Sequence, residues 1–296
     1  MFYITDLKTF CESNKVDDDK RNEGLVTPEG IRRFDNIAYG AHERQLLDVY
    51  RPENTEGSLP VIVSIHGGGW VYGNKEIMQF YCMSLAEHGF AVVNFSYRLA
   101  PEHRHPAMLE DVNSVFSWVL DHGAEYGFDT ANVFAVGDSI GATMLGLYCC
   151  ICNGSANPEV LEYPVRTPEG FLPKGLGLNC GLYNLVRGEE LLIDDLASAY
   201  LPEGGTEGEF RDISILRHVS AAFPPSFVMT ATEDFLAPQA KPFYDKLQSL
   251  GVPSEYRCYG DSEKEPAHVF HINIKLPVAG KCNDEQCAFF KRLTEV

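Results

Sequence analysis

Short apolar runs alternate with longer amphipathic stretches along most of this chain of 296 residues. The runs have the length of strands, and the stretches between them repeat apolar residues every three or four positions, as helices do when one face packs on a sheet. Residues 61–65 are almost continuously apolar, which predicts a strand buried on both faces. Further strands are predicted at residues 47–50, 91–95, 133–136, 176–179, 226–230 and 254–259.

The amphipathic stretches predict the helices, and their order predicts the fold. Strands that alternate with helices indicate an α/β fold, in which a mostly parallel sheet carries helices on both faces. We interpret residues 1–296 as a single domain. The polar N-terminal segment, residues 1–30, is expected to form a short helix and a loop, and residues 153–175 and 186–225 are expected to be modest insertions. Helices are predicted at residues 77–88, 109–122, 241–250 and 285–293, and directly after residue 139.

The charge balance excludes several kinds of partner. The formal net charge is −18, and such an acidic surface repels nucleic-acid backbones and anionic membranes. No apolar run approaches the roughly 18 residues that a membrane helix needs. The first residues show neither the basic region nor the apolar region of a secretory signal. We therefore expect a protein with no nucleic-acid partner and no membrane partner.

The cysteines point to a reducing compartment. There are nine of them, and an odd number fits poorly with a full disulfide framework. Cys149, Cys150 and Cys152 lie together on the helix predicted after residue 139, without the paired Cys-x-x-Cys spacing of a zinc site. They are expected to be buried, reduced thiols that pack as small apolar side chains. This usage favours a cytoplasmic location and predicts no metal site.

A strand, a turn of small residues and a helix follow one another around Ser139. Residues 137–141 read Gly-Asp-Ser-Ile-Gly, between the strand predicted at 133–136 and the helix after it. A turn this tight exposes the serine hydroxyl beside the first N–H groups of the helix and needs small residues on either side. Ser139 is a candidate nucleophile if a base, an orienting acid and an oxyanion site are present. The alternative is an ordinary turn in which the serine caps the helix.

A glycine loop comes directly off the strand at residues 61–65. Residues 66–70 read His-Gly-Gly-Gly-Trp, and three consecutive glycines cost backbone entropy but let N–H groups approach a ligand closely. Preorganised N–H donors are what an oxyanion hole requires, and the alternative is a flexible turn. His66 is expected to brace this loop by a hydrogen bond, and His103 and His105 are expected to be structural or to lie on the surface.

These two motifs are joined by a third, Tyr-Arg-Leu-Ala-Pro-Glu at residues 97–102. Their order and spacing resemble the hormone-sensitive-lipase-like family of α/β-hydrolases, especially small bacterial acetyl esterases. The resemblance runs from about residue 45 to the C-terminus. It implies an α/β-hydrolase fold with an eight-stranded sheet, hydrolysis of carboxylic esters without a cofactor or metal, and a homodimer as an open alternative. It also implies that the N–H groups of Gly68, Gly69 and Ile140 form the oxyanion hole.

The resemblance also implies where the acid and the base lie, because the chain order in this family is serine, acid, histidine. Asp234 follows the strand at 226–230 and precedes a leucine by two residues, as in the family, with Glu233 as the local alternative. His268 matches the His-x-Phe of the family, with His271 as the alternative. The predicted catalytic triad is therefore Ser139, Asp234 and His268.

Departures from the family pattern bear on the substrate. Ala142 and Thr143 stand where glycine and asparagine are usual, and Ile140 replaces a common alanine. The β-branched side chain of Ile140 is expected to narrow the acyl side of the pocket. The short N-terminal segment and the two modest insertions predict a small or minimal cap near the active site rather than a large lid. We therefore predict a serine esterase for small, short-chain esters, acetyl esters above all, that works through an acyl-enzyme intermediate.

Two other functions are compatible with this fold. An arylformamidase-like amide hydrolase has a similar glycine loop and serine turn, although residues 97–102 favour an esterase. A non-catalytic small-molecule receptor usually lacks the histidine that His268 supplies here. The alcohol part of the substrate is not specified by any motif.

Overall fold

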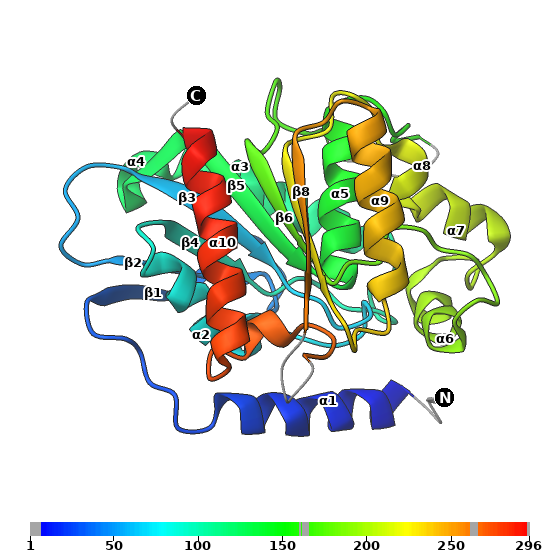
Figure 1. Cartoon of the computed structure of the whole chain (residues 1–296), viewed down its shortest axis with the longest axis horizontal. Coiled ribbons are helices and arrows are strands. Elements are labelled where there is room, and N and C mark those ends of the chain that lie inside the picture. The colour runs from blue at the N-terminus through cyan, green and yellow to red at the C-terminus, as the bar shows by residue number, and fades with distance from the viewer. Residues whose placement is uncertain (1–6, 160, 162–165, 261–265, 295–296) are drawn as a thin grey trace.

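A single sheet of eight strands runs through the computed structural model, which describes residues 7–159, 161, 166–260 and 266–294 (Figure 1). The strands are β1 (Ile31–Ala38), β2 (Leu46–Pro52), β3 (Leu59–Ile65), β4 (Ala91–Phe95), β5 (Phe128–Asp138), β6 (Gly175–Asn179), β7 (Ser226–Ala231) and β8 (Ser254–Tyr259). Their order in the sheet is β1-β2-β4-β3-β5-β6-β7-β8. Neighbouring strands from β4 to β8 pair in parallel, whereas β2 pairs antiparallel with β4 and β1 pairs antiparallel with β2. The predicted mostly parallel, eight-stranded sheet is confirmed.

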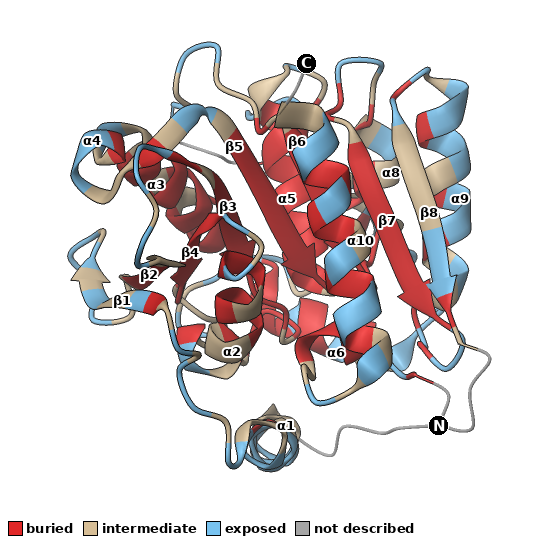
Figure 2. Cartoon of the chain, turned by 60° about the vertical axis from the view of Figure 1, so that its left-hand side comes forward, coloured by how far each residue is buried: buried red, intermediate tan, exposed pale blue. Residues whose placement is uncertain are grey.

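Helices cover both faces of this sheet (Figure 2). The helices are α1 (Leu7–Asn22), α2 (Lys75–Ala86), α3 (Ala107–Asp121), α4 (Gly123–Tyr126), α5 (Ile140–Cys152), α6 (Leu191–Tyr200), α7 (Glu207–Ile213), α8 (Ile215–His218), α9 (Ala237–Ser249), the 3-10 helix η1 (Phe270–Ile272) and α10 (Pro277–Thr294). Side chains of α3, α5 and α9 share one buried apolar cluster with Val63, and those of α2 and α10 share another with Ile62. Because successive residues of a strand point to opposite faces, β3 contributes to both clusters.

The cysteines on α5 follow the sequence prediction in part. Cys149 and Cys150 are free and buried, and Cys152 is free and half-buried. Burial raises the pKa of Cys150 to about 12, so its thiol is neutral and packs as an apolar group.

In β1, which the sequence did not predict, and in α10, the apolar pattern is interrupted. In β1, Ile31 is the one buried residue, and the pairing register with β2 shifts between Phe34 and Ile37, so no alternation marks the strand. Helix α10 begins at Pro277, before the predicted start. Its buried face includes the polar side chain of Asn283, which breaks the apolar stripe that would have located the first turns.

Helix α1 is longer than the short helix expected from residues 1–30. It spans 16 residues, and its one buried residue is the acidic Asp18. Figure 1 shows α1 lying across the sheet at the lower ends of the strands. The Tyr72 hydroxyl donates to Asp18 Oδ2 at 2.6 Å, and Arg21 Nη2 donates to the carbonyl oxygen of Ile77 at 2.9 Å. Leu7, Phe10 and Cys11 pack against the core from the first turns of α1. Polar contacts fix its second half, and apolar periodicity does not reveal them.

Candidate active site

Ser139 occupies a strained turn between β5 and α5. Its backbone has a φ of 52° and a ψ of −120°, a conformation that a non-glycine residue adopts only when its surroundings impose it. A β-carbon at Gly141 would collide with the carbonyl oxygen of Ile65, and one at Gly137 would lie 2.6 Å from the carbonyl carbon of Gly141. The turn therefore has the small flanking residues that its closeness to β3 requires. It presents the Ser139 side chain beside the first residue of α5, Ile140.

Two side chains from loops after neighbouring strands complete a line of hydrogen bonds with Ser139. Asp234 follows β7, and His268 lies in the connection between β8 and η1. His268 Nε2 lies 3.0 Å from Ser139 Oγ, and His268 Nδ1 lies 2.6 Å from Asp234 Oδ1. The structure thus brings together the three residues that the sequence predicted as a triad, in the order nucleophile, base, acid.

The carboxylate of Asp234 is held by several donors. Thr230 Oγ1 donates to Oδ2 at 2.7 Å, and the backbone N–H of Leu236 donates to Oδ1 at 2.9 Å. Burial alone would raise the pKa of Asp234, but the hydrogen bond from His268 and these two donors outweigh it and hold the pKa below its ordinary value. The carboxylate is therefore ionised and fixed in orientation next to the imidazole.

The alternative acid and base lie elsewhere. Glu233 is exposed, whereas Asp234 is buried. His271 is completely buried, and its ring packs edge-on against that of Tyr81 with centroids 5.1 Å apart. Burial lowers the pKa of His271 to about 3, so its imidazole stays neutral in the core. Neither residue is placed to exchange a proton with Ser139.

The glycine loop lies against the serine turn. Gly68 and Gly69 have φ values of 112° and 61°, and a β-carbon on Gly68 would collide with the carbonyl oxygen of Tyr72. The hydroxyl of Tyr97, from the third motif, donates to the carbonyl oxygen of His66 at 2.8 Å. His66 itself stacks on the ring of Tyr97, and its Nδ1 lies 2.7 Å from the carbonyl oxygen of Gly67. His66 therefore braces the loop, as its position in the sequence suggested.

The histidines after the third motif also lie where the sequence placed them. His105 is buried between the Tyr200 hydroxyl and the carbonyl oxygen of Leu161, at 2.9 and 2.7 Å. His103 is paired with His42 through their Nε2 atoms, 3.1 Å apart. Both histidines therefore have structural partners away from Ser139.

Asp138 is a site residue that the sequence reasoning passed over. It fills a variable position of the Gly-x-Ser-x-Gly pattern, and its Oδ2 accepts a hydrogen bond of 3.0 Å from the backbone N–H of Gly67. This bond ties the serine turn to the glycine loop across 71 positions of sequence. Burial raises the pKa of Asp138 to about 7. The available signal was an acidic residue at a position next to the nucleophile, where a buried charge needs a partner.

A cavity of about 150 Å³ opens in front of Ser139. The predicted residues Gly68, Gly69, Ile140 and His268 contribute to its wall. Apart from Asp138 and Ser139, the remaining lining is mostly apolar and comes from α1, α6 and the loops after β7 and β8: Phe10, Asn14, Leu192, Ile193, Leu196, Phe235 and Val269. Helices α1 and α6 therefore form a small cap over the site. The sequence indicated the two segments but not which of their residues face the serine.

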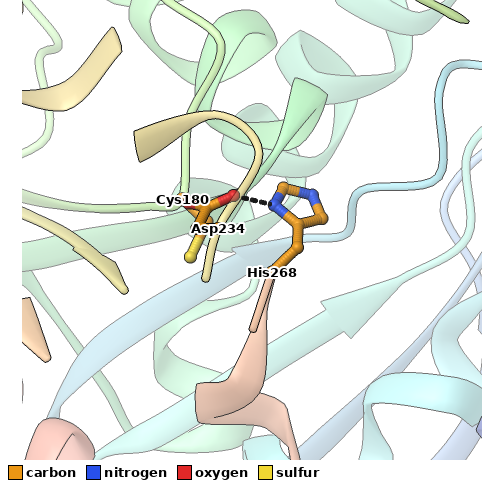
Figure 3. Close-up of side chains that lie close together, drawn as sticks. All are labelled: Cys180, Asp234 and His268. Atoms are coloured by element: carbon orange, nitrogen blue, oxygen red, sulfur yellow. Dashed lines mark hydrogen bonds and ion pairs between the residues drawn. The ribbon is translucent and has the colours of Figure 1, made fainter. Parts of the chain in front are cut away.

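Cys180 lies beside the Asp234–His268 pair (Figure 3). Its Sγ, a carboxylate oxygen of Asp234 and a ring nitrogen of His268 lie within 4.8 Å of one another, close enough to be considered as metal ligands. Burial raises the pKa of Cys180 well above its ordinary value, which keeps the thiol protonated, whereas a metal binds the thiolate. Asp234 and His268 are also already bonded to each other. We therefore interpret Asp234 and His268 as a hydrogen-bonded pair, with the neutral Cys180 thiol packed beside it.

A serine raised on such a turn at the carboxyl end of a parallel sheet, beside a histidine and an acid from later loops, defines the α/β-hydrolase class. Residues 62–272 match the family described as alpha/beta hydrolase fold, and the chain belongs to that family. The resemblance drawn from the three sequence motifs is thus confirmed. In the part of the chain that the structure describes, no helix combines the length and the apolar character needed to cross a membrane.

Known relatives carry esterase names. A probable isoprenylcysteine alpha-carbonyl methylesterase of Arabidopsis thaliana is 29% identical over 245 residues, which cover 77% of this chain and 50% of the relative. Carboxylesterase NlhH of Mycobacterium tuberculosis is 27% identical over 259 residues, which cover 82% of this chain and 77% of the relative. The chain spans about half the length of several curated relatives that it matches. The crystal structure of esterase B from Lactobacillus Rhamnosis has the same fold, with a TM-score of 0.84, 22% identity, and coverage of 98% of this chain and 94% of that one.

Proposed function

We propose that this protein is a serine carboxylesterase that hydrolyses small, short-chain esters, acetyl esters above all, through an acyl-enzyme intermediate. The observation that carries this proposal is the unbroken line of hydrogen bonds from Ser139 through His268 to Asp234, next to a cavity walled by the glycine loop. The esterase names of the relatives support the same class of reaction. We also propose that the residues described here act as one catalytic domain, since both apolar clusters pack on one sheet.

The first half of the reaction uses all three side chains. Ser139 Oγ attacks the ester carbonyl carbon while His268 Nε2 accepts the hydroxyl proton. Asp234 accepts the N–H of His268 Nδ1, which fixes the tautomer with a free Nε2 lone pair and stabilises the imidazolium that forms. The N–H groups of Gly68, Gly69 and Ile140 stabilise the negative oxygen of the tetrahedral intermediate.

The second half of the reaction returns the proton. His268 donates it to the leaving alcohol oxygen as the C–O bond breaks and the acyl-enzyme forms. A water molecule then attacks the acyl carbonyl, with His268 as base, and the carboxylic acid leaves as Ser139 regains its proton. Apart from the ester and one water molecule, these steps use side chains and backbone groups of this chain.

The acyl preference follows from the size of the cavity. Ile140 and Leu196 both line its wall, and the side chain of Leu196 would lie 2.6 Å from a β-carbon on Gly69. A volume of about 150 Å³ leaves room for a short acyl chain beside the reacting carbon. We therefore expect kcat/KM to fall steeply from acetyl to octanoyl esters of the same alcohol.

The test compares p-nitrophenyl acetate, p-nitrophenyl octanoate and N-formylkynurenine as substrates. We expect turnover of the acetate, much slower turnover of the octanoate, and loss of at least three orders of magnitude in kcat for Ser139→Ala with an unchanged fold. Ser249→Ala, an exposed serine on α9, is the matched control and should keep full activity. Faster turnover of N-formylkynurenine than of the acetate would favour an amide hydrolase. A preference for the octanoate would reject the short-chain assignment. Ser139→Ala with the activity of the wild type would reject the serine mechanism.

A further inference from the structure

A second, larger cavity adjoins the one in front of Ser139. Its volume is about 610 Å³, and Ile272, Leu276 and Val278 are among the apolar residues that line it. His268 and Val269 line both cavities. The two cavities therefore share a wall at the histidine that we assign as the base.

Residues of α1 line both cavities. Phe10 and Asn14 line the first cavity, and Asp17 and Arg21 line the second. Residues spaced by four, three and four positions lie on the same face of a helix. Figure 1 shows α1 lying straight across this end of the molecule. These four residues, of which Asp17 is exposed, thus place both cavities along one face of the helix.

This helix is held in place at several points. Asp18 accepts hydrogen bonds from Tyr72 and Arg21, and Arg21 also donates to the carbonyl oxygen of Ile77. Lys275 Nζ, from the loop that leads into α10, donates to the carbonyl oxygen of Glu23 just beyond the end of α1, at 2.6 Å. The second cavity is therefore formed before a ligand arrives, which lowers the entropic cost of filling it.

The chemistry decides which part of a substrate reaches the second cavity. His268 Nε2 must give its proton to the leaving oxygen, so the alcohol part of the ester lies next to His268. The acyl part lies in the first cavity, against Ile140 and the glycine loop. We infer that the second cavity binds the alcohol part of the substrate, and that the enzyme takes neutral esters of a short acid with an extended apolar alcohol. This inference rests on the proposed function.

The charged side chains that line the two cavities favour a neutral alcohol. Among the described residues that line the two cavities, Arg21 is the one lysine or arginine, and its guanidinium is engaged by Asp18 and the carbonyl oxygen of Ile77. Asp17 contributes an exposed carboxylate to the lining of the second cavity. An alcohol that carries a carboxylate or a phosphate would meet repulsion without a free cation to offset it.

The experiment measures kcat/KM for n-alkyl acetates from ethyl to octyl and, in parallel, for ethyl esters of acids from acetate to octanoate. We expect kcat/KM to rise about tenfold or more from ethyl to hexyl acetate, since each buried methylene adds to binding, and to fall along the acid series. In Val278→Trp, which fills the second cavity, the ratio of hexyl to ethyl acetate should drop to about one. Val26→Trp makes the same change at an exposed position and should keep the wild-type ratio.

A binding measurement keeps the inference testable if Val278→Trp does not fold. Calorimetry with Ser139→Ala should detect 1-octanol at least tenfold more tightly than 1-butanol, and octanoate should bind more weakly than 1-octanol. Equal rates along the alkyl acetate series, an unchanged ratio in folded Val278→Trp, or equal binding of the two alcohols would overturn the assignment of the cavity. If no ester is hydrolysed at all, the proposed function fails, and the alcohol titration still reports separately on the cavity.

Discussion

His268 Nδ1 lies 2.6 Å from Asp234 Oδ1, although 34 positions separate the two residues in the chain. Adjacent parallel strands explain the contact, because Asp234 follows β7 and His268 follows its neighbour β8. An isolated bridge between Glu233 and Ala267, the residues just before each of them, aligns the two loops. The imidazole is therefore oriented by the sheet as well as by the carboxylate.

Asp234→Asn should lower kcat for p-nitrophenyl acetate by about three to four orders of magnitude. An amide can donate to His268 Nδ1, which favours the tautomer whose Nε2 carries the proton and cannot act as a base. Glu233→Gln, the same kind of change at the exposed neighbour, should keep activity within a factor of about two. Steady-state kinetics of both variants test this, and a dead Glu233→Gln beside an active Asp234→Asn would reverse the assignment.

The two histidines near the end of the chain should respond in opposite ways. His268→Ala should abolish ester turnover with little change in melting temperature, because its ring is partly exposed and acts on Ser139. His271→Ala should keep most of the kcat but lower the melting temperature by several degrees, since it leaves a cavity against Tyr81. Kinetics and thermal unfolding separate the two roles. Loss of activity in His271→Ala alone would make it the base.

The parts of this structure that could be predicted from the sequence depend on local patterns. Continuous apolar runs such as residues 61–65 locate the buried central strands, because such strands face apolar groups on both sides. The serine turn is recognisable because its geometry excludes any large residue at Gly141. Where local sterics restrict the residue type, the sequence carries the information.

The cap and the second cavity could not be predicted in this way. The apolar residues of α1 that pack against the core, Leu7, Phe10 and Cys11, lie in its first turns. Its second half is fixed by the hydrogen bonds of Asp18 and Arg21 with residues more than 50 positions away. Asp138 likewise acts through a backbone N–H of a distant loop. Such polar contacts have no periodicity along the chain, so only the three-dimensional arrangement reveals them.

Gly68→Ala should lower kcat by about two orders of magnitude or more, the loss expected when an oxyanion donor is displaced. The new methyl group would collide with the carbonyl oxygen of Tyr72, and φ at this position is 112°. Gly89→Ala is a suitable control, because Gly89 also has a positive φ, 90°, but no atom lies within 4 Å of the added β-carbon. If both variants lose kcat to a similar extent, general backbone strain rather than displacement of an oxyanion donor in the glycine loop explains the loss.

Asp138→Asn should become more stable relative to the wild type as the pH rises from about 4 to about 7. Burial raises the pKa of Asp138 from 3.8 to about 7, so across this range the unfolded chain loses the proton while the folded protein keeps it. The wild type therefore loses free energy of unfolding, by up to on the order of 4 kcal/mol, and the loss stays constant at higher pH. The asparagine carbonyl oxygen can still accept the N–H of Gly67 without this cost. Denaturant unfolding at several pH values tests the effect, with Asp121→Asn at an exposed position as the control. If the difference in stability between Asp138→Asn and the wild type does not change with pH, Asp138 ionises as readily in the folded protein as in the unfolded chain.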